Sequence, residues 1–265
     1  MNSSILTKAC VLVASWYVCW AAIPASPLCA EEDEVLHIAA PISTLIVTGE
    51  DYPGHKWQDT TPVIKEQLTK DAILNVEVTE DSRFLASPKL HDYDVVVLHF
   101  KNYDPKKPGR AAFDNMKKYV ENGGGLVLVH FACGAFEEFK KDYEKVAGRV
   151  WIGLEHNLKD RHQHDPHGPF TVDIVKKDHP ITQGITSFET RDELYTCLEG
   201  TSDIEVLATA VSKVDGKRYP IAFVVQCGKG RVFHCVLGHD PASLQVKEVG
   251  DLFRNACIWA GSAPE

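Results

Sequence analysis

The chain has 265 residues; 25 % of them are charged, 44 % are hydrophobic, and the formal net charge at pH 7 is −9. This composition is typical of a globular protein with enough apolar residues for a sizeable core. The sequence contains no basic stripe with interleaved aromatic residues. Because nucleic-acid affinity comes mostly from the neutralisation of phosphates, we expect no nucleic-acid partner.

Residues 1–30 have the layout of a cleavable signal peptide. Lys8 is followed by an apolar, uncharged stretch over residues 9–23, and an acidic run follows Ala30. We therefore expect cleavage near Ala30, a flexible segment over 31–42, and a secreted or periplasmic mature protein that is not held in a membrane. The alternative is an N-terminal anchor helix, although the apolar stretch is shorter than the roughly 20 residues of a membrane span.

Five cysteines follow the expected cleavage site: Cys133, Cys197, Cys227, Cys235 and Cys257. Their number is odd and no two have a CxxC spacing, which argues against a disulfide framework. Most of them lie in apolar runs, so we expect small core residues.

The first half of the expected domain, which we place over residues 43–262, alternates strands with helices. An apolar, β-branched run predicts a strand at 43–48. Thr61 and Pro62 are expected to cap and begin a helix that runs to about Lys70. The next runs predict, in chain order, strands at 73–79 and 93–100, a helix at 109–122 ended by three glycines, a strand at 126–130 and a helix at 136–147.

The C-terminal third has the pattern of an antiparallel sheet. We expect strands at 170–175, 204–210, 219–226 and 231–237, followed by a closing helix at 249–260. An Asp-Gly turn at 214–217 predicts a hairpin. The whole order predicts an α/β fold, with a doubly wound, mostly parallel sheet and an antiparallel C-terminal extension.

Ligands of such sheets bind beyond the carboxyl ends of the parallel strands. The polar residues expected there are His55, Asp81, His99, His130, His239 and Asp240. His130 is the strongest candidate, because a triple glycine and an apolar strand direct it toward the crevice. His99 has a second interpretation as a hydrogen-bonded core residue, and His55 as an ordinary loop residue.

Residues 150–168 have no apolar periodicity and predict a long loop with four histidines. His162 and His164 could chelate one metal ion, with His156 upstream as a third ligand. The segment only superficially resembles the HxHxDH signature of metallo-β-lactamase-type hydrolases, because Asp165 comes one position early. A solvated polar loop is the alternative interpretation.

Four motifs, in order along the chain, resemble the ThuA-like (trehalose utilisation) family of the class I glutamine amidotransferase-like superfamily. They are GGGLVLVHFA at 123–132, DHPITQG at 178–184, DELY at 192–195, and GKGRVF at 228–233 leading to LGH at 237–239. The resemblance implies a flavodoxin-like fold and a carbohydrate substrate, specifically a keto-sugar derived from a disaccharide.

In the amidotransferases that share this fold, a GxCxG turn presents a strained nucleophilic cysteine. Counting back from Gly134 places Ala132 at that position, and Cys133 one residue away from it. We therefore expect no amidotransferase nucleophile. A hydrolase with a Cys133–His239 dyad is an alternative, and it requires a thiolate beside the base.

Histidines and carboxylates without a nucleophile suit acid–base chemistry, with or without a divalent metal. We expect His130 and His239 to move protons in the hydrolysis, elimination or isomerisation of a small carbohydrate, with Glu193 as acidic partner and His55 beside them. Substrate contacts are expected from Trp57, Tyr195, Asp81, His99 and Asp240. A sugar-binding module without catalysis and an interaction domain with a vestigial site are the alternatives, and the oligomeric state stays open.

Overall fold

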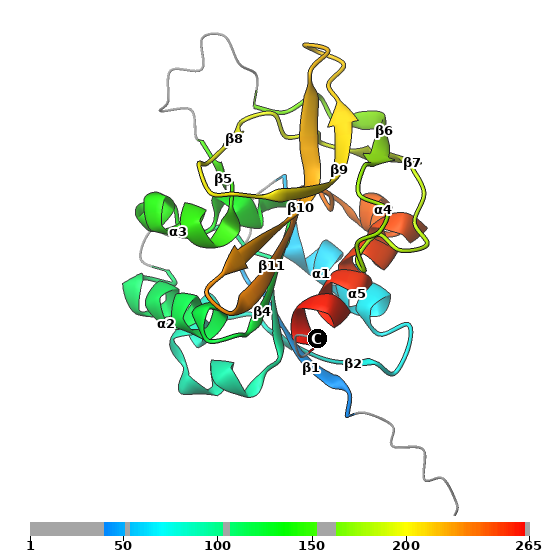
Figure 1. The fold of residues 1–265 in the computed structure, drawn as a ribbon. Coiled ribbons are helices and arrows are strands. Elements are labelled where there is room, and N and C mark those ends of the chain that lie inside the picture. Colours follow the sequence, from blue (N-terminus) through cyan, green and yellow to red (C-terminus); the bar gives the residue numbers. More distant parts are fainter. Residues whose placement is uncertain (1–39, 51–53, 103–106, 153–162, 263–265) are drawn as a thin grey trace, which may run out of the picture. The chain divides into compact units, whose positions relative to one another are not determined.

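A nine-stranded sheet forms the centre of the computed structural model, which describes residues 40–50, 54–102, 107–152 and 163–262 (Figure 1). Its strand order is β2-β1-β3-β4-β11-β10-β9-β6-β7. The first five strands are parallel: β2 (Leu74–Thr79), β1 (Ile42–Val47), β3 (Val95–Leu98), β4 (Gly125–Val129) and β11 (Gly230–Cys235). This half has the doubly wound, flavodoxin-like order that the sequence predicts.

The other half of the sheet is antiparallel, as expected for the C-terminal third. It consists of β10 (Arg218–Cys227), β9 (Glu205–Val211), β6 (Gly168–Ile174) and β7 (Phe188–Asp192). A separate short pair joins β5 (Val150–Trp151) to β8 (Leu198–Glu199). Strands β5, β7 and β8 were not predicted from the sequence.

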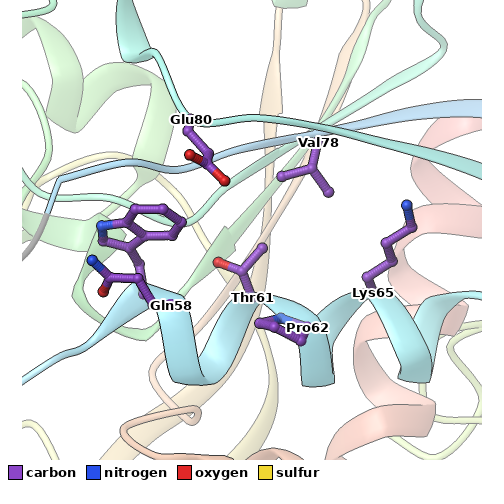
Figure 2. A pocket seen from close by; sticks show the side chains of 7 residues that line it. Gln58, Thr61, Pro62, Lys65, Val78 and Glu80 are labelled. Atoms are coloured by element: carbon purple, nitrogen blue, oxygen red, sulfur yellow. The ribbon is translucent and has the colours of Figure 1, made fainter.

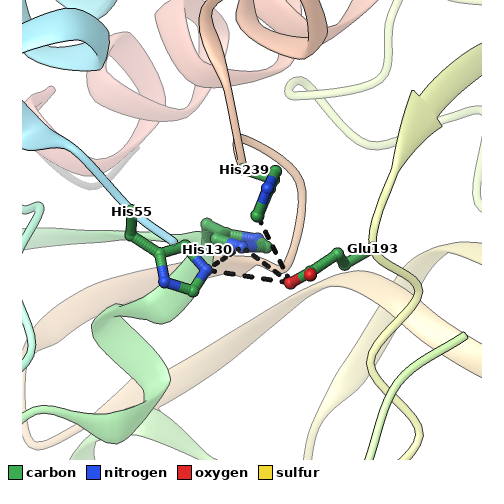
Figure 3. Close-up of side chains that lie close together, drawn as sticks. All are labelled: His55, His130, Glu193 and His239. Atoms are coloured by element: carbon green, nitrogen blue, oxygen red, sulfur yellow. Dashed lines mark hydrogen bonds and ion pairs between the residues drawn. The ribbon is translucent and has the colours of Figure 1, made fainter. Parts of the chain in front are cut away.

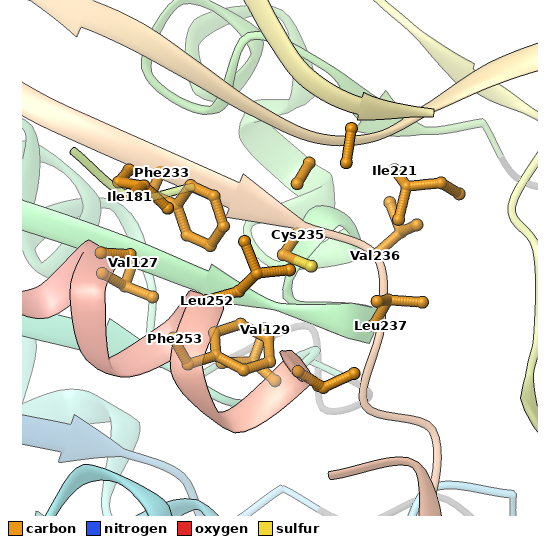
Figure 4. Packing of buried hydrophobic residues seen from close by; sticks show 14 of the residues in the cluster. Val127, Val129, Ile181, Ile221, Phe233, Cys235, Val236, Leu237, Leu252 and Phe253 are labelled. Carbon is orange, nitrogen blue, oxygen red and sulfur yellow. The ribbon is translucent and has the colours of Figure 1, made fainter. Parts of the chain in front are cut away.

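Helices cover both faces of the parallel half. Hydrophobic residues of α1 (Trp57–Leu68) and α5 (Lys247–Gly261) belong to one core cluster, and those of α2 (Arg110–Glu121) and α3 (Lys140–Ala147) to another. Successive residues of β4 alternate between the two, because neighbouring side chains of a strand point to opposite faces. Figure 4 shows Val127 and Val129 facing Leu252 and Phe253 of α5.

The triple glycine after α2 allows this close packing. Gly123 has φ +119°, a left-handed conformation that ends the helix. A Cβ atom at Gly125 would lie 2.7 Å from the carbonyl oxygen of Ala260 at the end of α5. Any larger residue would therefore push α5 away from β4, the strand that carries His130.

Two helix starts differ from the prediction. Helix α1 begins at Trp57, so Thr61 lies inside the helix and is not its cap; the hydroxyls of Thr60 and Thr61 contact His99. The helix expected at 136–147 begins only at Lys140, after the short 3₁₀ turn η4 (Glu137–Phe139), since Phe136 has a left-handed φ of 55°.

The remaining short elements are the 3₁₀ turns η1 (Ser82–Ala86), η2 (Pro88–Asp92) and η3 (His130–Gly134), and the helix α4 (Pro241–Leu244). Among the residues described, none of the helices is both long and apolar enough to cross a bilayer. The expected signal peptide lies outside the described residues, as do His156 and His162 of the histidine loop.

Candidate functional site

Four side chains converge beyond the carboxyl ends of the parallel strands: His55, His130, Glu193 and His239 (Figure 3). They come from the loop after β1, the end of β4, the residue after β7 and the loop after β11. One ligand atom of each lies within 4.8 Å of the others. The structure thus brings together the four residues that the sequence analysis selected for catalysis, which we call the His3Glu cluster.

His130 occupies a strained position at the end of β4. Its φ of 46° is left-handed, a conformation rare for residues with a side chain and often found at functional sites. The strained turn therefore falls at His130, and the expectation that Ala132 occupies the nucleophile position is wrong. Counting back from Gly134 placed the strained residue two positions too late in the chain. The turn η3 already begins at His130, the first residue after β4.

The backbone determines the tautomer of His130. Its Nδ1 lies 2.6 Å from the carbonyl oxygen of Val236, which can only accept a hydrogen bond, so Nδ1 carries the proton. In the neutral ring, Nε2 then presents its lone pair to the cluster. A histidine held in this way by a backbone carbonyl is a common arrangement of metal ligands.

The lone pair of His130 Nε2 is crowded by other polar atoms. The Tyr195 hydroxyl lies 2.7 Å away and His55 Nε2 lies 3.0 Å away. This lone pair accepts one strong hydrogen bond, and the neutral ring of His55 can turn either an N–H or a lone pair toward it. A proton or a metal ion among these atoms would hold the nitrogens of His55 and His130 together.

Glu193 supplies the negative charge that such a cation needs. Its Oε2 lies 3.7 Å from Nε2 of His55, 3.7 Å from Nε2 of His130 and 3.3 Å from Nδ1 of His239. Burial alone would raise the pKa of Glu193, but its interactions with the imidazoles of His130, His239 and His55 outweigh burial and lower it. Glu193 is therefore ionised at neutral pH.

The pKa values of the two outer histidines shift in opposite directions. Burial lowers the pKa of His55 to about 4, and the opposing hydrogen bond to Glu193 only partly offsets this. His55 is thus a neutral ring with a lone pair to give. Burial also lowers the pKa of His239, but hydrogen bonding and charge from Glu193 outweigh burial and raise it above its ordinary value.

The composition of the cluster fits a divalent transition metal. Three imidazoles and one carboxylate are the ligand types that zinc and its neighbours prefer. Three of the four ligands carry little exposed surface: the side-chain exposure is 0 % for His130, 11 % for His55 and 13 % for Glu193. A metal held there would be shielded from bulk water.

Asp192 holds two arms of the cluster together, a role that the sequence analysis did not assign. The carboxylate is fully buried. It accepts hydrogen bonds from the backbone N–H groups of Glu193 (2.7 Å) and Gly238 (2.7 Å) and from the Ser243 hydroxyl. It therefore links the end of β7 to the loop that carries His239.

Of the expected substrate contacts, two lie at this site. Tyr195 is buried against His130, with its hydroxyl pointing to Nε2. Asp240 lies at the rim and pairs with His167. His167 was not singled out in the sequence, because nothing in a polar loop marks which histidine faces the site.

The structure changes the interpretation of the histidine loop. His164 Nδ1 lies 2.9 Å from the Asp165 carbonyl oxygen and 3.7 Å from Glu193 Oε1, beside the cluster. Asp165 is buried, and its carboxylate binds the Ser212 hydroxyl and the Lys213 backbone N–H. Asp165 therefore anchors the loop. The described part of the histidine segment does not form a metal site separate from the His3Glu cluster.

His99 lies inside the protein. Its ring is fully buried, with hydroxyls of Thr60 and Thr61 at 3.2 Å and 3.1 Å from its two nitrogens. Burial lowers its pKa to about 3. The structure thus favours the core interpretation: His99 packs on Phe131, which in turn packs on His55, and so supports the site from behind.

Asp81 and Trp57 are not members of the His3Glu cluster. Asp81 is exposed, caps η1 and pairs with Arg83. Trp57 lines a pocket of about 420 Å³ between α1 and β2 that shares no residue with the His3Glu cluster (Figure 2). Asp81 was selected by its strand-end position, which does not determine side-chain direction, and Trp57 was selected as an aromatic residue that could stack on a sugar.

Cys133 does not have the surroundings of a nucleophile. The side chain is buried in the hydrophobic core, and burial raises the pKa of its thiol, which disfavours the thiolate. Among the described residues, no hydrogen bond joins it to His239. The dyad alternative thus has no support in the geometry.

Comparison with known proteins agrees with the motifs. The sequence model of the family described as trehalose utilisation (ThuA) matches residues 43–260. A ThuA-like protein from Parabacteroides merdae has a TM-score of 0.72 at 25 % identity, with coverage of 84 % of this chain and 90 % of the other. For a ThuA-like protein from Bacteroides uniformis the values are 0.63, 21 %, 83 % and 92 %.

More distant structures show the fold alone. A β-galactosidase from Bacillus circulans sp. alkalophilus has a TM-score of 0.53 at 13 % identity; the match covers 84 % of this chain but only 32 % of the enzyme. A comparison with curated proteins finds no match.

Proposed function

This chain belongs to the trehalose-utilisation (ThuA) family, and we propose that it is a carbohydrate-active enzyme whose His3Glu cluster holds a divalent metal and acts on keto-sugars derived from disaccharides. The observation that carries the proposal is the convergence of His55, His130, Glu193 and His239, whose ligand atoms lie within 4.8 Å of one another. Membership of the family supports a sugar as the substrate, and the His3Glu cluster supports metal-assisted acid–base chemistry.

The reaction follows from the acidity of a proton next to a ketone. A bound divalent metal would supply charge that stabilises the oxygen of a substrate carbonyl as it becomes negative. Elimination and isomerisation both begin with transfer of the neighbouring C–H proton to a base, and the electron pair left behind forms a carbon–carbon double bond. In elimination, the bond to the departing sugar oxygen breaks, and that oxygen takes up a proton.

We assign Glu193 as the base that accepts this proton, through the carboxylate oxygen that does not face the three imidazoles. Its Oε2 faces the three imidazoles, whereas its Oε1 is turned toward His164 at the rim. The Tyr195 hydroxyl, 2.7 Å from His130 Nε2, is a donor within the same cluster. The signal peptide expected over residues 1–30 leads us to place this reaction in the periplasm or outside the cell.

Metal analysis combined with a substrate screen tests the proposal. Protein purified without chelator should contain about one equivalent of a divalent metal per chain and should convert 3-keto-trehalose but not trehalose. Removal of the metal should abolish turnover, and its return should restore turnover. Full activity in metal-free protein would contradict the metal, and metal without conversion of any keto-disaccharide would contradict the substrate.

Asp192→Asn should weaken metal binding without unfolding the protein. The amide is isosteric, but its NH2 group must face one of the N–H or O–H donors that the carboxylate accepts. We expect a loss of about 10- to 100-fold in metal affinity, measured by competition with a chromogenic chelator. Asp173→Asn, at an exposed carboxylate paired with Arg218, is the control and should leave the affinity unchanged. An unchanged affinity in Asp192→Asn would show that the buried carboxylate does not position the ligands.

A further inference from the structure

Residues 163–168 form a well-anchored wall beside the His3Glu cluster. The Asp165 carboxylate accepts hydrogen bonds of 2.7 Å from the Ser212 hydroxyl and of 2.7 Å from the Lys213 backbone N–H. Main-chain hydrogen bonds also pair this segment with residues 194–196. The histidines that it carries are therefore held in defined positions.

His167 uses this anchoring to form a pair with Asp240. Its Nε2 lies 3.1 Å from Asp240 Oδ2. The other oxygen of the carboxylate accepts a hydrogen bond of 2.8 Å from the Ser243 backbone N–H, at the start of α4. Both partners are thus oriented from opposite sides before any ligand arrives, which reduces the entropic cost of binding.

The pair lies at the open side of the cluster. The rings of His167 and His239 have centroids 5.0 Å apart. The side chains of His167 and Asp240 are 32 % and 33 % exposed, whereas His130 in the cluster is fully buried. A ligand with one end at the cluster can therefore contact His167 and Asp240 with the part of the molecule that adjoins this end.

We propose that His167 and Asp240 bind two neighbouring hydroxyl groups of the sugar and so select a hydroxylated substrate. A carboxylate accepts hydrogen bonds from hydroxyls, and the imidazole beside it donates or accepts one. This inference rests on the proposed function and assigns the recognition part of the same site. The metal is held by the cluster, and the hydroxyl groups are held by the pair.

Isothermal titration calorimetry on the purified full chain tests this assignment, with trehalose and 3-keto-trehalose as probes. His167→Ala and Asp240→Asn should each raise the Kd for the bound sugar about tenfold or more, because the first removes the imidazole and the second replaces one accepting carboxylate oxygen with an NH2 group. Asn at position 240 still caps α4, so that variant keeps the fold. His91→Ala, at an exposed histidine at the opposite ends of the parallel strands, is the control.

The readout separates recognition from metal binding. The affinity for the metal alone should be the same in wild type, His167→Ala and Asp240→Asn, and any turnover should show a raised KM with kcat within about twofold. An unchanged sugar Kd in both variants, or a loss of metal affinity equal to the loss of sugar affinity, overturns the inference, as does a wild-type protein that binds neither sugar. A wild type that binds sugar without turnover contradicts the proposed function alone.

Discussion

His130→Ala should remove metal binding and reduce turnover of 3-keto-trehalose by about 10²- to 10⁴-fold. The ring stands at the centre of the cluster, within 2.7 Å of Tyr195, 3.0 Å of His55 and 3.7 Å of Glu193. Its loss leaves Glu193 with fewer partners in a buried site and takes away the ligand whose tautomer the backbone determines. Metal content by elemental analysis and steady-state kinetics measure the two effects.

A buried histidine on the neighbouring strand provides the matched control. His234 of β11 is also fully buried and also points Nδ1 to a backbone carbonyl, that of Ala147 at 2.9 Å. It lies outside the cluster, so His234→Ala should destabilise the fold by an amount comparable to His130→Ala while retaining the metal. If His130→Ala kept a full equivalent of metal, the cluster would not be the metal site.

The parallel half of the fold could be predicted because its strands are buried on both faces. Continuous aliphatic runs such as Val95–Leu98 mark such strands directly. Strand β7 was missed because only alternate residues are buried: Phe188, Thr190 and Asp192 face inward, and charged residues lie between them. A buried aspartate at the end of a strand looks like a surface residue in a sequence.

The sequence was sufficient to predict which residues form the site, but not how their side chains are oriented. The strand-end rule and the motifs selected His55, His130, Glu193 and His239, which the fold does assemble. The same rule selected His99 and Asp81, whose side chains turn into the core and out to solvent. Side-chain direction depends on the backbone of each turn, such as the left-handed φ of His130, and this does not follow from spacing.

Acidification from pH 6.5 toward pH 4 should destabilise this protein strongly. Burial lowers the pKa of His99 to about 3 and that of His234 to about 4. In the unfolded chain these rings take up protons near pH 6.5, while in the folded protein they stay neutral until about pH 4 or below. The unfolded state therefore binds more protons in this window, so the free energy of unfolding falls as the pH falls.

The slope of this loss identifies its source. Each such histidine contributes roughly 1.4 kcal/mol per pH unit once its unfolded form is protonated, so the two together approach roughly 3 kcal/mol per pH unit. That is a large part of the roughly 5–15 kcal/mol that typically stabilises a domain. His234→Gln can still donate to the Ala147 carbonyl but cannot titrate, so its slope should be smaller by about one proton.

Urea unfolding between pH 6.5 and 4.5 measures these slopes, with His91→Gln as a control that should match wild type. Equal slopes in wild type and His234→Gln would show that the buried ring is already protonated in the folded state. Its Nε2 has no hydrogen-bond partner among the described residues, and a charged N–H there would be a buried donor without an acceptor. In the neutral ring this nitrogen has only an unsatisfied lone pair, which costs less free energy than a buried charged N–H group without an acceptor. The histidine is therefore protonated in the unfolded chain at a higher pH than in the folded protein.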